Sequence, residues 1–155
     1  MRAEPALPVR PPRLSVRRRF ALYIIAAGLW LTGTAWLLFH YFLMRETPFG
    51  PNPHPLEFWS RAAHGAFGFA SLWLFGTLWA AHVFEGWRSL RRRWTGSLMF
   101  GLFSWLVLSG YLLYYLGGEE LLTATTILHW SIGLAAPVPF LLHRFAAAGE
   151  KRTAA

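Results

Sequence analysis

The chain has 155 residues, no cysteine and a formal net charge of +8 at pH 7. The lack of cysteine excludes disulfide bonds, iron–sulfur ligation, a thiolate nucleophile and covalent haem attachment through a C-x-x-C-H motif. At this length we expect one membrane domain and no second catalytic domain, so partner chemistry comes from another chain.

The first predicted segment, residues 1–19, is rich in proline and arginine. Such a composition buries little apolar surface, so we expect a disordered basic N-terminus on the cytoplasmic side. The apolar run that follows, residues 20–44, is too long for the core of a signal peptide. We therefore expect it to stay in the membrane as a helix.

Four apolar runs of 20 to 25 residues without a charge follow one another along the chain. They cover residues 20–44, 62–84, 97–116 and 121–142. A helix of about 20 residues crosses a hydrocarbon core of about 30 Å, so each run is long enough to span a membrane. The sequence therefore predicts an all-α integral membrane four-helix bundle with a short cytoplasmic tail at residues 145–155.

The segments between these runs differ in length and composition. Four prolines in the outer loop, residues 44–61, make a regular helix unexpected there. An inner loop covers residues 86–96, and residues 117–120 form a turn so tight that the third and fourth spans should be antiparallel neighbours. Two prolines inside the fourth span, Pro137 and Pro139, predict a kink.

Lysines and arginines are distributed unequally between the two sides of the predicted membrane. Thirteen of the fifteen flank the cytoplasmic side, and only Arg45 and Arg61 lie on the other side. Because positively charged flanks stay inside, both termini are expected to be cytoplasmic. We attribute the net charge to these flanks and to attraction toward anionic lipid, and we expect no nucleic-acid recognition.

Two spans each carry a pair of histidines. His64 and His82 are eighteen residues apart, and His129 and His143 are fourteen apart. Both spacings return a helical side chain to nearly the same face, with the members of a pair about 27 and 21 Å apart along the axis. Because an ionisable side chain inside a membrane is costly, these four histidines are candidate functional residues.

The second and fourth spans run in the same direction, so their histidines form two layers. We pair His64 with His129 toward the outside and His82 with His143 toward the inside, as axial ligands to the iron of a b-type haem, which takes two neutral imidazoles. The unequal spacings leave a mismatch of about 6 Å, which helix tilt and the proline kink are expected to absorb.

Glycines support this interpretation. Gly68 and Gly133 each follow an outer histidine by four residues, where a larger side chain would collide with a porphyrin. For four further glycines, helix packing is favoured over haem clearance. These are Gly28, Gly33, Gly101 and Gly110.

Other polar residues have weaker assignments. His40 is a substitute ligand or, as we favour, an interfacial histidine bonded to backbone or water, and His54 is expected to be solvated. Three arginines either pair with haem propionates or are simple flank charges. They are Arg61, Arg88 and Arg144.

Several motifs resemble the di-haem b-type cytochromes of bacterial membranes, in particular small four-helix members of the prokaryotic cytochrome b group, some of them classed only as domains of unknown function. The motifs are HGAFG at 64–68, HVFEGW at 82–87, RRRWTG at 91–96, SGYLLYYLG at 109–117, LHWSIG at 128–133 and LLHR at 141–144. The resemblance implies His129 and His143 as ligands, two b haems, and a location in the bacterial inner membrane. The eighteen-residue spacing in the second span departs from the fourteen usual in cytochrome b.

The function implied is electron transfer across the bilayer, with exchange to a quinone or a redox partner subunit of a membrane oxidoreductase in a respiratory chain. No catalytic residue is assigned, and the oligomeric state stays open. A haem-free structural or assembly subunit that packs against a partner protein is the alternative from another class. A metal or haem transporter is a third and weaker candidate. The lack of a carboxylate inside any predicted span also weakens a proton-coupled transporter.

Overall fold

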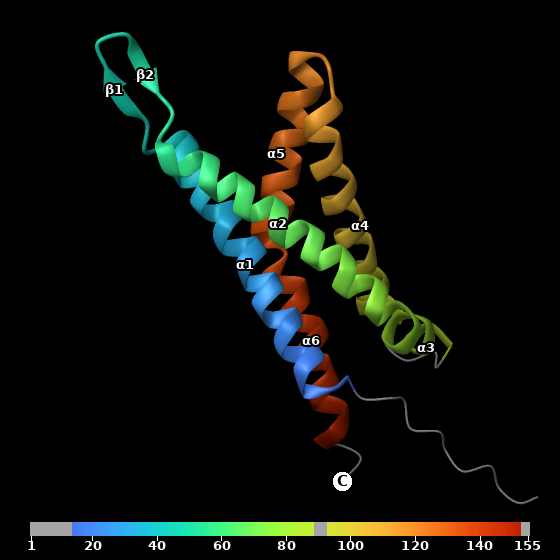
Figure 1. The fold of residues 1–155 in the computed structure, drawn as a ribbon. Coiled ribbons are helices and arrows are strands. Elements are labelled where there is room, and N and C mark those ends of the chain that lie inside the picture. Colours follow the sequence, from blue (N-terminus) through green and yellow to red (C-terminus); the bar gives the residue numbers. More distant parts are fainter. Residues whose placement is uncertain (1–13, 89–92, 153–155) are drawn as a thin grey trace, which may run out of the picture.

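The computed structural model describes residues 14–88 and 93–152, and this part of the chain is mostly helical (Figure 1). In chain order its elements are α1 (Val16–Tyr41), β1 (Arg45–Thr47), β2 (Gly50–Asn52), α2 (Pro55–Leu78), the π-helical stretch η1 (Trp79–Phe84), α3 (Glu85–Arg88), α4 (Arg93–Tyr115), α5 (Glu119–Ala135) and α6 (Pro137–Arg152).

Helix α1 begins earlier than the sequence predicts. The side chain of Ser15 accepts a hydrogen bond of 3.4 Å from the backbone N–H of Arg18 and so caps the first turn. The prediction of disorder is therefore wrong from Val16 onward. Residues 1–13 of the same segment lie outside the described residues.

A short β-hairpin and an early helix start replace the irregular outer loop. Strands β1 and β2 pair antiparallel, and Gly50 turns the chain between them with a φ of 106°. Helix α2 then starts at Pro55, seven residues before the predicted span, which begins at residue 62. The expectation of no helix here was wrong because proline at a first helical position loses no hydrogen bond.

The long helices form two antiparallel pairs. Helix α1 packs along α2, and α4 packs along α5, while α5 also contacts α1 and α6 contacts α4. The two pairs are inclined to each other (Figure 1). The expected turn is confirmed, because α5 begins directly after Gly118, whose φ is 100°. The predicted kink is also confirmed, because the helix is interrupted between Ala135 and Pro137.

The structure describes parts of the predicted inner loop and of the predicted C-terminal tail. Helix α3 occupies the start of the expected inner loop, and residues 89–92 of that loop lie outside the described residues. Helix α6 extends to Arg152, so most of the expected tail is helical, and residues 153–155 are outside the described part.

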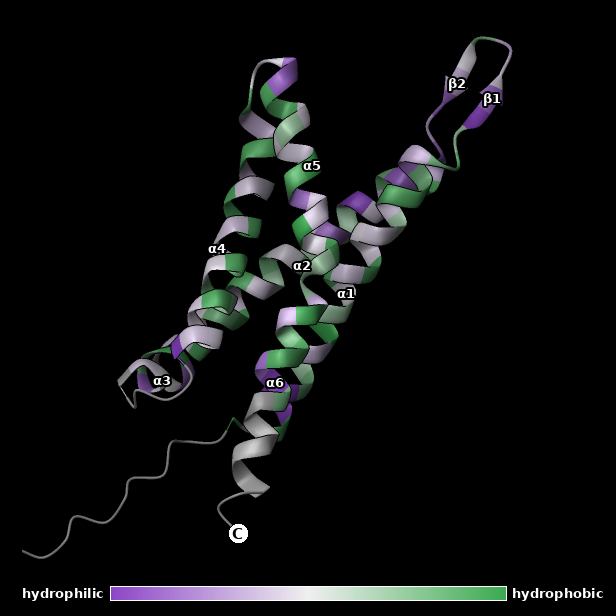
Figure 2. Cartoon of the chain, turned by 180° about the vertical axis from the view of Figure 1, so that it is seen from behind, coloured by the Kyte–Doolittle hydropathy of each residue, from purple (hydrophilic) through white to green (hydrophobic). Residues whose placement is uncertain are grey.

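The helices have the surface of a membrane protein. Among the described residues, the buried apolar side chains are Leu74 and Leu78, whereas large ones such as Phe69 and Trp73 are exposed. Hydrophilic residues concentrate at β1 and toward the helix ends (Figure 2). Exposed apolar side chains on long helices indicate contact with a lipid bilayer.

Three helical segments in the described part of the chain are long and apolar enough to cross a membrane. They are Val16–Tyr41, Arg93–Tyr115 and Glu119–Phe145. The second predicted span, now divided between α2 and η1, is not among them. That span stays a prediction.

Candidate functional site

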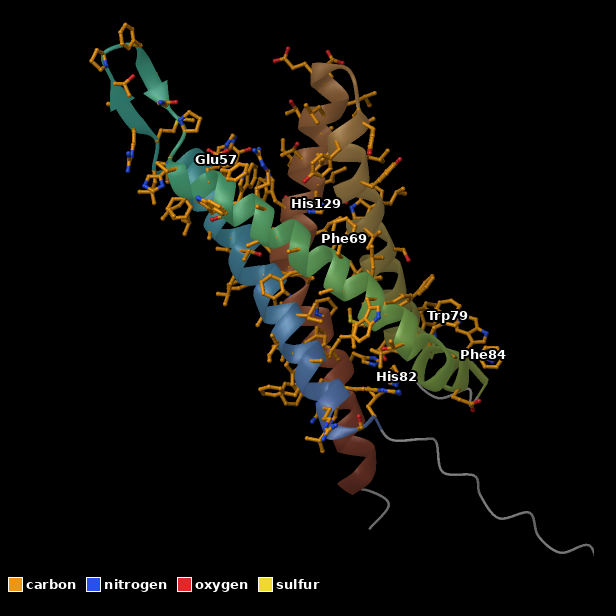
Figure 3. The ribbon with its side chains drawn as sticks, in the orientation of Figure 1. Glu57, Phe69, Trp79, His82, Phe84 and His129 are labelled. Carbon is orange, nitrogen blue, oxygen red and sulfur yellow. The ribbon has the colours of Figure 1, made fainter. Side chains whose placement is uncertain are left out.

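The four histidines of the second and fourth predicted spans meet in two pairs. The ring centroids of His64 and His129 are 6.2 Å apart with an interplanar angle of 83°, and those of His82 and His143 are 6.3 Å apart at 89°. Figure 3 labels His129 and His82, which lie at two separate levels along the helices. These are the two pairs expected from the spacing, and their role as haem ligands stays a prediction.

Helix α1 orients His64. The ring atom Nδ1 lies 3.0 Å from the backbone carbonyl of Leu29, which accepts only, so Nδ1 carries the hydrogen. Thr32 Oγ1 is 3.3 Å from the same nitrogen and donates its own proton to the Gly28 carbonyl at 2.6 Å. A Cβ on Gly33 would be 3.1 Å from His64 Cε1, so this glycine lets the ring approach α1.

Helix α4 orients His129 in the same way. Ser109 Oγ donates to the carbonyl of Trp105 at 2.7 Å and accepts from His129 Nδ1 at 2.8 Å. Ser109 is the most deeply buried of the described residues, with 1% of its surface exposed. A Cβ on Gly110 would be 3.3 Å from His129 Cε1, which matches the role of Gly33 beside His64.

The inner pair combines a hydroxyl partner with an unusual backbone. His143 Nδ1 is hydrogen-bonded to Thr95 Oγ1 at 3.0 Å, which links α6 to the start of α4. His82 lies in the π-helical stretch η1. Short π-helical turns inside α-helices are rare and occur frequently at functional sites.

The π-helical stretch takes up a small part of the difference between the two histidine spacings. A π-helix has more residues per turn than an α-helix, so it uses up residues while advancing less along the axis. This shortens the path from His64 to His82 by about one residue's rise, or about 1.5 Å. The helix interruption at Ala136 lies between His129 and His143. The sequence analysis named the proline kink and helix tilt, and it missed η1.

The glycines fall into two groups. A Cβ on Gly68 would meet no atom within 4 Å, and one on Gly133 would meet only Leu106 Cδ2 at 3.9 Å, so protein packing does not require glycine at either position. Gly28, by contrast, is in close contact with the ring of Phe67, which agrees with helix packing. Beside Gly101 there is again no atom within 4 Å of an added Cβ.

The two outer histidines outside the pairs have other partners. His40 Nδ1 donates to Glu57 Oε1 at 2.9 Å, so the bond goes to a carboxylate rather than to backbone or water. His54 is half-buried, stacks on Phe39 and accepts a hydrogen bond from the N–H of Leu56 at 3.2 Å, so the expectation of a solvated side chain was wrong. As the residue that caps α2, it satisfies a free backbone donor.

The arginines proposed for propionates differ in their surroundings. Arg61 is exposed, and Arg144 donates from Nε to the hydroxyl of Tyr23 at 2.9 Å. The side chain of Arg88 lies outside what the structure describes. Over the described residues, no group of three or more histidines and carboxylates is close enough to hold a single metal ion.

Three hydroxyl residues were missed by the sequence analysis, although a signal for them exists. Thr32, Thr95 and Ser109 each hydrogen-bond a histidine, and each is followed directly by a glycine. In an apolar span, a hydroxyl beside a glycine marks a place where a neighbouring helix approaches and a polar partner is needed.

Comparisons of the chain with protein-family models, with curated proteins and with solved structures give no match.

Replacing Ser109 by Ala removes the acceptor of a half-buried imidazole N–H. An unpaired buried donor costs about 1–3 kcal/mol, so we expect a lower unfolding temperature in detergent, measured by circular dichroism. Ser71→Ala is the matched control, because the Ser71 hydroxyl bonds within its own helix, to the carbonyl of Gly68. Equal unfolding temperatures of the two variants would contradict a role of Ser109 in holding His129.

Proposed function

We propose that this chain is a membrane b-type cytochrome that carries electrons across the bilayer between two bis-histidine haems. His64 and His129 hold the haem toward the outer side, and His82 and His143 hold the one toward the inner side. The protein exchanges electrons with a quinone or with a redox partner subunit. In this proposal α1, α2 with η1, α4, and α5 with α6 are the four membrane-spanning parts of one bundle.

The observation that carries the proposal is the separation within both histidine pairs. Metal–imidazole nitrogen bonds of about 2.0–2.1 Å put the centroids of two rings on opposite sides of one ion about 6.4 Å apart. The observed separations are 6.2 and 6.3 Å. The two pairs share this separation although they lie on helices with different histidine spacings.

The hydrogen bonds of the outer pair support the same role. In His64 and His129 the hydrogen is on Nδ1, which leaves Nε2 as the nitrogen with the lone pair. A histidine that binds a metal characteristically donates its other N–H to a backbone carbonyl or a polar side chain, which sets the tautomer and the ring orientation. Leu29 and Ser109 supply these acceptors.

The surroundings also fit a porphyrin. Four imidazoles form two sets of two, as a six-coordinate haem requires, whereas a zinc site would need three or four ligands together. The open space beside Gly68 leaves room for a flat ring next to His64. The residues present therefore fit two b haems.

When bound, the haems supply a one-electron redox couple that no side chain of this chain provides. The residues of the chain orient the ligands, keep the imidazoles neutral and surround them with apolar side chains. Such surroundings and the bonds to Nδ1 are the means by which a protein tunes a haem potential. The inner and outer ligand layers are separated by fourteen residues of α5 and α6, or about 21 Å.

Purified protein from haem-replete cells is expected to contain about two b haems per chain in a pyridine haemochrome assay. Because each iron needs two imidazoles, His129→Ala and His143→Ala should each lower the content to about one. His54→Asn is the control, since asparagine also caps a helix and this histidine belongs to neither pair. A wild-type protein without a Soret band would refute the proposal and favour the haem-free structural subunit.

The ring planes predict an electron paramagnetic resonance signature. The two rings of each pair are nearly perpendicular, at 83° and 89°. Perpendicular imidazoles leave the iron d orbitals of π symmetry almost equal in energy, whereas parallel ones split them. We expect highly anisotropic low-spin signals from the oxidised protein, and removal of one signal by His129→Ala. A rhombic spectrum typical of parallel ligands would contradict the ring geometry.

We place both termini on the cytoplasmic side of a bacterial inner membrane, because thirteen of the fifteen lysines and arginines flank that side. The lack of native cysteine makes this testable with single-cysteine variants. A cysteine at Glu46, on β1, should react with a membrane-impermeant maleimide in intact cells. A cysteine at Leu14 should react only after the membrane is opened, and the reverse pattern would invert the topology.

A further inference from the structure

A carboxylate is buried near the outer end of α2. Glu57 is only 8% exposed, although it lies in the first turn of the helix. Its Oε1 accepts from His40 Nδ1 at 2.9 Å, and its Oε2 is buried without a hydrogen-bond partner in the described structure. Because a buried carboxylate is costly unless it is paired, the hydrogen bond from His40 is the interaction that offsets its burial.

His40 connects this carboxylate to the surface of the protein near the outer end of α1. The side chain of His40 is 37% exposed, whereas that of Glu57 is 11% exposed. The imidazole stacks on Trp36, with ring centroids 4.7 Å apart, and Trp36 Nε1 is also buried without a partner. The pair therefore has one end exposed near the outer end of α1 and one end inside the helix interface.

The pair lies above the outer candidate haem ligand. Glu57 precedes His64 by seven residues on α2, which is two helical turns on nearly the same face and a distance of about 10 Å. On α1, His40 follows Gly33, the glycine beside His64, by the same number of residues. At this distance, a change of charge at the outer iron would change the electrostatic potential at His40 and Glu57.

We propose that His40 and Glu57 form a redox-linked proton site, which binds a proton from the outer aqueous phase more tightly when the outer haem holds an electron. The proposal rests on the function proposed above. The electron comes from the reductant that serves the outer haem, and the proton is held between the imidazole and the carboxylate. Reoxidation removes the electron and returns the proton to the same phase, so charge and atoms balance.

Coulomb's law sets the size of the coupling. Two unit charges about 10 Å apart, at the effective dielectric constant of about 20 that suits protein sites, change proton affinity by about tenfold. Other charged or titratable groups lie on the elements around the pair. They are Tyr41 on α1, Arg61 on α2, Arg45 and Glu46 on β1, and His54 before α2.

The test is a spectroscopic potentiometric titration of the purified haem protein at a series of pH values. Loss of the proton at higher pH leaves more negative charge near the iron, so the midpoint potential of one haem should fall as pH rises. A tenfold coupling corresponds to a total fall of about 59 mV for a one-electron couple. The potential of the other haem, about 21 Å away along the fourth span, should change much less.

The variants separate a proton site from a structural contact. Glu57→Gln keeps an oxygen that accepts from His40 but binds no proton, so the pH-dependent fall should disappear while both haems remain bound. His40→Gln is a second variant with the same expected loss. Glu46→Gln is the matched control, because this exposed carboxylate lies on the same side of the chain and should leave the fall unchanged.

Each outcome has a distinct meaning. A protein without haem refutes the proposed function itself. Two bound haems with potentials independent of pH refute the proton site alone. A pH-dependent potential that persists in Glu57→Gln and His40→Gln also refutes it, because the proton is then bound elsewhere.

Discussion

An imidazole between apolar helices has to keep its polar nitrogens bonded, and this constraint organises much of the structure. Water is absent from the hydrocarbon core, so each partner has to come from a neighbouring helix. Leu29 and Thr32 on α1 serve His64, and Ser109 on α4 serves His129. The bonds that satisfy the histidines therefore also join α1 to α2 and α4 to α5.

The two helix pairs use the same local device. In each, the first helix carries a hydroxyl residue followed by a glycine, and the second carries an outer histidine. The hydroxyl reaches Nδ1, and the glycine admits the edge of the ring. Because each Nδ1 atom is bonded to the partner helix within its own pair, the other ring nitrogen remains for a group shared between α2 and α5, as the proposed haem requires.

Much of the local structure was predictable from the sequence, because it depends on neighbours along the chain. Apolar runs predict long helices, Gly118 and Pro137 mark a turn and an interruption, and histidine periodicity groups His64 with His129 and His82 with His143. The early start of α2 at Pro55 was missed because proline interrupts a helix interior but is favoured at the first position of a helix. Only the backbone conformation shows which of these positions Pro55 occupies.

The sequence by itself determined that the chain has long apolar helices with their histidines on defined faces. Only the tertiary structure decided which groups hold those histidines, that His82 lies in a π-helical stretch, and that Glu57 is buried against His40. The physical reason is the separation along the chain of the residues that interact. Periodicity is a property of neighbouring residues, whereas burial and hydrogen-bond partners depend on which helices meet, such as α4 with α5 or α1 with α2.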